Sequence, residues 1–230
     1  FRISEYKPYA NADEWHKILQ ANEYSYLSNP TGIYARANEM IYVFVEGEIA
    51  EGAFNNCDKL TGVTLPESVT SIGKNAFYDC DGLTEFTIPD SVTEVGANAF
   101  YSCDKLTSVT IGDSVTTIGV GAFSYCDSMT SVTIPDSVTT IGSSAFFYCG
   151  SLTSVNIPDS VTTIGYEAFY NCTSLTSVYC KATTPPALGW EVLYNNGSGR
   201  KIYVPMESVE AYKSASYWED YASAIVGYDF

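Results

Sequence analysis

The chain has 230 residues, a formal net charge of −16, and a hydrophobic fraction of 46%. The negative charge argues against binding to nucleic acid or to anionic lipid, because both require Lys and Arg to neutralise phosphate. No stretch approaches the roughly 18 consecutive apolar residues that a membrane-spanning helix needs, and we expect, from the abrupt start at Phe1, a mature or trimmed chain.

Residues 1–48 are predicted to form an N-terminal cap, or to be the remnant of a preceding domain. Ala12–Ala21 has the apolar periodicity of a helix, and Met40–Val45 is predicted to be a strand. The single histidine, His16, lies on this predicted helix. A catalytic histidine needs an orienting carboxylate and a nearby nucleophile, and no such motif surrounds His16. We therefore predict no catalytic residue.

A fixed period of 23 residues governs the next part of the chain. Six cysteines and six phenylalanines keep this step: Cys57, Cys80, Cys103, Cys126, Cys149 and Cys172, and Phe54, Phe77, Phe100, Phe123, Phe146 and Phe169. A sequence period of this length is typical of a solenoid, in which each repeat forms one coil and buries its apolar side chains against its neighbours.

The first part of each repeat is predicted to be a strand. In the unit 152–172, the spacing of Val155 and Ile157 places both on one side of the strand, so that Ser154 and Asn156 face outward. Pro158 lacks the N–H that a sheet needs and therefore ends the strand.

The second part of each repeat combines an extended segment, a corner and a turn. The β-branched Val161 and Ile164 favour a second short extended segment. Gly165 recurs in every unit, which indicates either a backbone angle closed to other residues or a close approach between coils. The spacing of Ala168, Phe169 and Cys172 suits one helical or 3₁₀ turn with one face inward.

The cysteines are predicted to be buried, unpaired thiols that act as small hydrophobic side chains. Stacked side chains point in the same direction, which gives poor geometry for a disulfide; disulfides between neighbouring coils are the alternative. The seventh cysteine, Cys180, falls in the inward strand column of Ile134 and Ile157. The C-x-x-C spacing of a structural zinc site is absent, and we predict no metal and no cofactor.

Two phrases, "MTSVTIPDSVTTIG" at 129–142 and "IPDSVTTIGSSAFFYC" at 134–149, resemble the BspA-like class of bacterial leucine-rich repeats. The resemblance runs from Ile49 to Cys180, and residues 181–225 look like the C-terminal extension of such arrays. The predicted fold class is therefore a β-rich, leucine-rich-repeat-like solenoid: a curved right-handed coil with a parallel sheet and short helical or 3₁₀ turns, capped at both ends. Its predicted parts are residues 1–48, 49–180 and 181–230.

The last part, 181–230, is predicted to be a C-terminal cap on the final coil. Lys201–Pro205 is a short extended run, and Glu207–Ser214 and Tyr217–Ala224 have the pattern of helical turns. We interpret these turns as a lid, because an uncapped end coil exposes its core and its unpaired strand edges.

The resemblance also implies a function. Proteins of this class are secreted or displayed on the bacterial surface, where they serve in adhesion and in host or cell–cell interaction. We therefore expect a non-enzymatic, extracellular or cell-surface protein whose repeat surface binds protein or glycan ligands. The alternatives are a structural spacer that projects another domain, and a glycan-binding module.

Two surfaces are candidates for binding. The outward strand positions form a ladder, which is either a contact surface or a set of residues that simply suit a solvated sheet: Glu85, Thr87, Ser108, Thr110, Ser131, Thr133, Ser154, Asn156, Ser177 and Tyr179. Aromatic residues near the core Phe either pack between coils or form an exposed stripe: Tyr78, Tyr101, Tyr125, Phe147, Tyr148 and Tyr170.

The sequence contains two acidic columns, and stacked carboxylates of the first could bind calcium. One comprises Glu67, Asp90, Asp113, Asp136 and Asp159, and the other comprises Asp58, Asp81, Asp104 and Asp127. Calcium takes six to eight oxygen ligands. However, the acids of the first column stand at turns next to Ser, where Asp bonds to nearby backbone, and the calcium-binding β-roll signature is missing. We therefore favour a local turn role for both columns.

Overall fold

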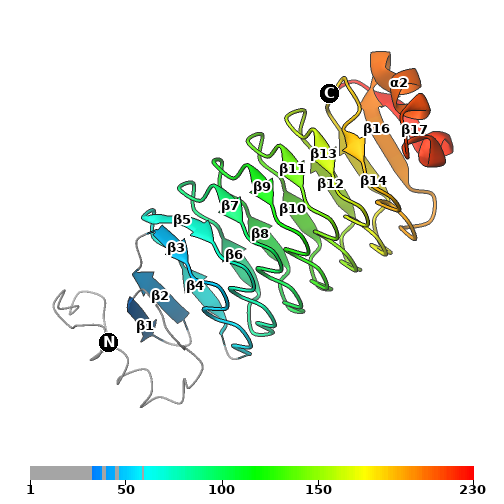
Figure 1. Cartoon of the computed structure of the whole chain (residues 1–230). Coiled ribbons are helices and arrows are strands. Elements are labelled where there is room, and N and C mark those ends of the chain that lie inside the picture. Colours follow the sequence, from blue (N-terminus) through cyan, green and yellow to red (C-terminus); the bar gives the residue numbers. More distant parts are fainter. Residues whose placement is uncertain (1–32, 38–39, 45–46, 59) are drawn as a thin grey trace.

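Each coil contributes two short strands, and successive coils stack these strands into two parallel sheets (Figure 1). The structure is a computed structural model that describes residues 33–37, 40–44, 47–58 and 60–230. The predicted helix Ala12–Ala21, with His16, lies outside the described residues.

The described residues give two sheets of seven strands each. The first sheet holds β6 (Glu85–Thr87), β8 (Ser108–Thr110), β10 (Ser131–Thr133), β12 (Ser154–Ile157), β14 (Ser177–Cys180), β16 (Lys201–Pro205) and β17 (Ile225–Tyr228). The second holds β3 (Gly47–Ile49), β5 (Val69–Ile72), β7 (Glu94–Val95), β9 (Thr117–Ile118), β11 (Thr140–Ile141), β13 (Thr163–Ile164) and β15 (Ala187–Leu188).

Strands pair with the same residue of the next repeat, as Val109 does with Val132. The solenoid predicted from the period and the parallel sheet that the resemblance implies are thereby confirmed. The second extended segment predicted around Val161 and Ile164 contains β13, which belongs to the second sheet.

A small third sheet lies at the N-terminal end. It contains β1 (Ile33–Ala37), β2 (Met40–Phe44) and β4 (Gly62–Thr64). Strands β1 and β2 are antiparallel, and β2 runs parallel to β4 of the first coil. The strand predicted at Met40–Val45 is thus confirmed over its described residues.

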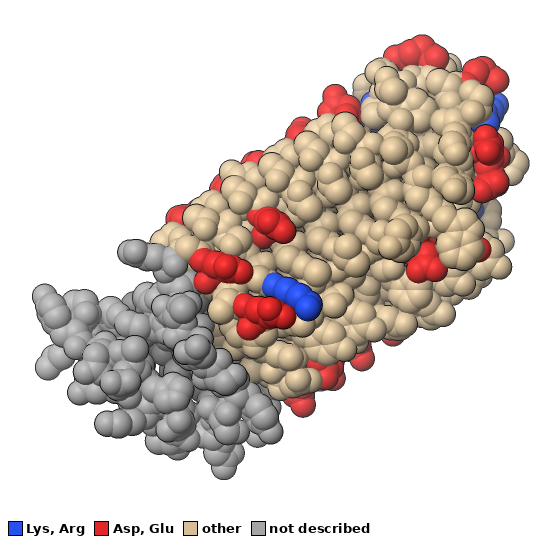
Figure 2. All heavy atoms as spheres, in the orientation of Figure 1, with Lys and Arg blue, Asp and Glu red and all other residues tan. Residues whose placement is uncertain are grey.

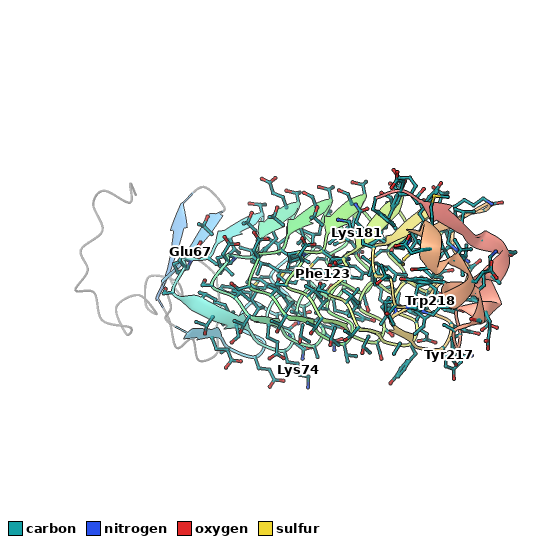
Figure 3. The ribbon with its side chains drawn as sticks, turned by 90° about the horizontal axis from the view of Figure 1, so that it is seen from above. Glu67, Lys74, Phe123, Lys181, Tyr217 and Trp218 are labelled. Carbon is teal, nitrogen blue, oxygen red and sulfur yellow. The ribbon has the colours of Figure 1, made fainter. Side chains whose placement is uncertain are left out.

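The core fills the space enclosed by the coils, and its central feature is the column of repeated phenylalanines. Neighbouring rings in this column lie 4.9–5.4 Å apart between centroids, and their planes differ by at most 12°. Phe123 shows the typical position, in the interior, whereas Lys74 lies on the outside (Figure 3). Identical rings stack in this way because adjacent strands lie only about 4.8 Å apart.

The turn after each corner glycine keeps the hydrogen-bond spacing of a 3₁₀ turn but does not extend into a helix. The Ala76 N–H donates to the Gly73 carbonyl, at 3.2 Å. Asn75, however, adopts a positive φ of 56°, which is incompatible with a right-handed helix. The Phe77 N–H donates instead to the Ala99 carbonyl of the next coil. The turns therefore hold the coils to one another as well as reversing the chain.

The corner glycines are required by close approach between coils. None of Gly73, Gly96, Gly119, Gly142 and Gly165 has a positive φ. A Cβ on Gly119 would instead lie 2.6 Å from the carbonyl oxygen of Val95, in the preceding coil. The Gly119 N–H donates to this same carbonyl, at 2.8 Å. Of the two explanations that the sequence left open, the structure selects close approach.

All seven cysteines are free thiols, and six of them are buried, while Cys57 in the first coil is half-buried. Five thiols also act as hydrogen-bond donors, each to the Phe carbonyl of the preceding coil, at 3.0–3.2 Å. In the last coil Asn196 takes over this role and donates to the Phe169 carbonyl. The cysteines are therefore both packing residues and backbone donors.

Short helices cover the last coil. They are η2 (Met206–Ser208), α2 (Val209–Ser214) and η3 (Glu219–Ala224). Tyr212 and Trp218 are buried beneath them, with ring centroids 4.9 Å apart. The Tyr212 hydroxyl donates to the Ala182 carbonyl and the Trp218 indole N–H to that of Pro186, both at 2.8 Å. These bonds fix the helices to the final coil.

Substitution of a corner glycine tests the close approach. Gly119→Ala is expected to lower the free energy of unfolding by about 1–3 kcal/mol, because the new methyl group presses on the backbone of the neighbouring coil. Gly150→Ala is the matched control: its φ is not left-handed, and its Cβ would meet only the Thr173 hydroxyl, at 3.8 Å. We expect a change within about 0.5 kcal/mol there. Urea denaturation followed by circular dichroism measures both, and equal losses would contradict this explanation.

A second pair of variants separates hydrogen bonding from packing in the cysteine column. Cys126→Ala and Cys126→Ser differ by one oxygen atom, and only Ser can still donate to the Phe100 carbonyl. We expect Ala to be less stable than Ser by about 0.5–1.5 kcal/mol, the usual net contribution of such a bond. If denaturation shows Ala to be equal to or more stable than Ser, the thiol serves for packing alone.

Candidate binding surface

The outward residues of the first sheet form one continuous surface, which we call the outer face. Two columns run along it in register: Thr87, Thr110, Thr133, Asn156, Tyr179 and Tyr203 in one, and Glu85, Ser108, Ser131, Ser154, Ser177 and Lys201 in the other. The structure therefore brings all the predicted outward residues together. Most are exposed, and Ser154, Ser177 and Tyr179 are half-buried.

The outer face changes in chemical character from one end to the other. It begins with the exposed carboxylate of Glu85, continues through small hydroxyl groups, and reaches Tyr179, Tyr203 and the ammonium group of Lys201 on β14 and β16. The edge strand β17 follows, with Val226 in register with Tyr203. Figure 2 shows the side of the molecule on which Lys74 lies; there, acidic side chains lie mainly along the margins and near the ends, and the area between them is largely uncharged.

A shallow hollow of about 340 Å³ marks the acidic end of the outer face. It lies over β4, β6 and β8, and its lining includes Glu67, Glu85 and several Thr and Ser hydroxyls. Gly62 stands one repeat before Glu85 and offers no side chain there.

An aromatic cluster occupies the other end. The rings of Tyr179 and Tyr203 are stacked, with centroids 4.6 Å apart and planes 13° apart. Tyr228 packs edge-on against both, at 5.6 and 5.4 Å, and Phe230 packs edge-on against Tyr228. Tyr228 and Phe230 are 42% and 51% exposed. Among the described outer-face residues, this cluster is the concentration of side chains that most often anchor binding.

Sequence reasoning identified Tyr179 but missed Tyr203, Tyr228 and Lys201. Tyr179 and Tyr203 are 24 residues apart, one more than the repeat step, so Tyr203 falls outside the 23-residue register. The signal was nevertheless present, because Ile202 and Val204 alternate with Tyr203 in the way that inward and outward residues alternate in the earlier strands.

The predicted aromatic stripe is a ladder on the turn side of the coils. Tyr78 and Tyr101 stack at 4.8 Å, and the ladder continues through Tyr125, Tyr148 and Phe147 to Tyr170. Tyr194, which was not predicted, extends it by a further stacked ring at 5.3 Å. Most of these ring faces are covered by neighbouring rings. Between its ends the ladder therefore offers mainly ring edges and hydroxyl groups to a partner, whereas its last ring, Tyr194, is 52% exposed.

The first acidic column lies at exposed turns. The Asp113 N–H donates to the Asp90 carboxylate of the preceding coil, at 2.9 Å, so this carboxylate does bond to backbone. Among the described residues, no group of three or more His, Cys, Asp or Glu side chains has an arrangement that holds a metal ion.

The second acidic column crowds like charges together. The pKa of the Asp104 carboxyl is raised above its ordinary value, first by partial burial and then by Asp81 and Asp127 in the adjacent coils. The pKa of Asp79 is raised for the same reasons, by burial and by Asp81 and Asp58. Carboxylates stacked one coil apart thus disfavour one another's charged form.

The thiols are held in a neutral state. Burial raises the pKa of Cys103 and of Cys172 to about 12. The pKa of Cys57 is raised to about 11, mainly by burial and to a smaller extent by the negative charge of Asp58. A nucleophilic cysteine needs a lowered pKa, so these three cysteines lack the environment of a reactive thiol.

Known proteins share this repeat architecture. A family model described as "BspA type Leucine rich repeat region" matches residues 47–216, in six copies. Among solved structures, the leucine-rich repeat protein of T. pallidum is similar at 29% identity and a TM-score of 0.60, over 70% of this chain and 86% of that chain.

A leucine rich cell surface protein from Faecalibacterium prausnitzii A2-165 is similar at 29% identity and a TM-score of 0.47, over 69% of this chain and 55% of that chain. No curated protein matches the chain. None of the described helices has the length and apolar character to cross a membrane.

Alkaline pH is expected to destabilise the fold through the thiols. The pKa of Cys103 and Cys172 is about 12 in the folded chain, against 9.0 for an unperturbed thiol. Their neutral forms therefore contribute stability that is complete below pH 9 and is lost as the pH rises from about 9 toward 12. Urea midpoints measured across this range should fall, and the fall should be smaller in Cys103→Ala. An identical pH dependence in that variant would contradict this assignment.

Proposed function

Because the chain belongs to the BspA-type leucine-rich repeat family, we propose that it is a non-enzymatic bacterial surface or secreted protein that binds other macromolecules through its outer face. The membership confirms the resemblance that the phrases at 129–149 indicated. Adhesion to host proteins or to other cells is the role that this resemblance implies.

The observation that carries the proposal is the change of side chains along the outer face. Stacking alone favours one repeated residue at each position, as in the run of Ser at 108, 131, 154 and 177. The two ends depart from this uniformity, with Glu85 at one and the Tyr179–Tyr203 pair at the other. Such departures on an exposed sheet give a partner distinct contacts at each end, and Tyr is among the residues enriched in binding hot spots.

The non-enzymatic part of the proposal draws on the thiols and the carboxylates. The pKa values of Cys57, Cys103 and Cys172 are raised rather than lowered. The carboxylates of the first acidic column lie at exposed turns, and exposure leaves them in contact with water.

Binding is tested with the purified chain immobilised on a biosensor. We expect at least one partner, among purified extracellular-matrix proteins and intact neighbouring cells, to bind at micromolar concentration or below. The double variant Ser131→Lys/Thr133→Lys places two bulky cations in the middle of the outer face and should weaken binding by about tenfold or more.

Val120→Lys is the matched control, because Val120 is 55% exposed and lies in the turn after β9 of the second sheet, away from the outer face. It should leave binding unchanged. If no partner binds at micromolar concentration, or if Val120→Lys weakens binding as much as the outer-face variant does, the proposal fails. The first of these results would favour the structural spacer.

A further inference from the structure

The inner rings of the turn-side ladder and the first ring of the outer-face cluster differ in which ring surfaces they leave open. In the ladder on the turn side, an inner ring such as Tyr125 has aromatic neighbours from both adjacent coils. In the outer-face cluster, the stack begins at Tyr179, and the preceding coil carries Asn156 at the same position. Tyr179 is thus the first ring of its stack.

The orientation of Tyr179 follows from its contact with Tyr203. The two rings are nearly parallel, and their centroid separation of 4.6 Å is close to the distance between adjacent strands. Stacked rings turn one face toward each other, so one face of Tyr179 is directed toward Tyr203 on β16, the strand that follows β14 in the sheet (Figure 1). The second face of Tyr179 consequently points back toward β12, above Asn156.

The ring is held in this orientation before any ligand arrives. Tyr228 contacts both Tyr179 and Tyr203 edge-on, with interplanar angles of 73° and 69°. Two stacked rings braced by a third lose little conformational freedom on binding, which favours affinity. A fixed aromatic plane of this kind is a stacking platform.

Hydrogen-bonding groups surround the open face. Asn156 is exposed and in register with Tyr179, and its amide has both donors and an acceptor. Ser154 and Ser177 stand in the adjacent column. A ligand here therefore needs one apolar face for the ring and polar groups around its rim. The neighbouring Asn and Ser supply no apolar wall for the aliphatic side chain of a peptide.

We propose that Tyr179 and Asn156 form a carbohydrate subsite, in which a pyranose ring of an oligosaccharide stacks its C–H face on Tyr179. Two neighbouring sugar hydroxyls pair with the amide of Asn156, one as donor and one as acceptor. This inference rests on the proposed function, since it names the ligand class for one end of the same outer face.

The test uses the whole chain on an array of neutral and acidic oligosaccharides, followed by titration calorimetry with the best ligand. Tyr179→Thr and Asn156→Thr restore the residue that the same column carries at 87, 110 and 133, so both variants keep a residue that this sheet accommodates. Each is expected to weaken binding by about tenfold or more. Tyr148→Thr, which removes a 36%-exposed ring from the ladder, is the control and should bind as the parent does.

The outcomes separate this inference from the proposed function. It is overturned if the parent binds no oligosaccharide, if Tyr179→Thr binds unchanged, or if Tyr148→Thr loses as much affinity. A parent that binds a protein partner, loses it in Ser131→Lys/Thr133→Lys and binds no glycan overturns the carbohydrate subsite alone. Absence of any ligand of either kind overturns both.

Discussion

The spacing between coils, about 4.8 Å from strand to strand, is the constraint on which the rest of the structure depends. Each side chain lies beside its own counterpart in the next repeat, so a residue type is acceptable only if it packs against itself at this distance. Phenylalanine does so by parallel stacking, at 4.9–5.4 Å. At the corner of Gly119 the neighbouring backbone comes so close that no Cβ fits.

The spacing between coils also brings some hydroxyl groups within hydrogen-bond distance of the preceding coil's backbone, whereas others have no such partner. The Thr116 hydroxyl donates to the Thr93 carbonyl of the preceding coil, at 3.2 Å, and the Ser137 hydroxyl donates to the Val115 carbonyl, at 2.7 Å. These columns support the backbone, as the cysteine thiols do. The hydrogen bonds of the described residues tie neither Ser131 nor Thr133 in this way, so hydroxyls of the outer face are available to a ligand.

The period made the solenoid, its inward columns and its outward strand positions predictable, because all three follow from alternation and repetition. The choice between strain and close approach at Gly119 was not predictable, since it depends on how near the preceding coil comes. The donor role of Cys126 was missed because a thiol at a 23-residue period looks like any small apolar residue; Asn196, in the last coil, was the clue. Tyr203 was missed because one extra residue breaks the register.

A residue that differs from the others in its column indicates more about a possible ligand than the repeated residues do. A repeated Ser or Thr is sufficiently explained by stacking, and so it says little about a ligand. The strand itself accommodates Thr in this column, as it does at 87, 110 and 133, and Tyr179 adds the contacts with Tyr203 and Tyr228. The cluster around Tyr179 also leaves aromatic surface exposed, at Tyr228 and Phe230. Exposed aromatic side chains grouped at one end of a polar sheet are more economically explained by recognition than by folding.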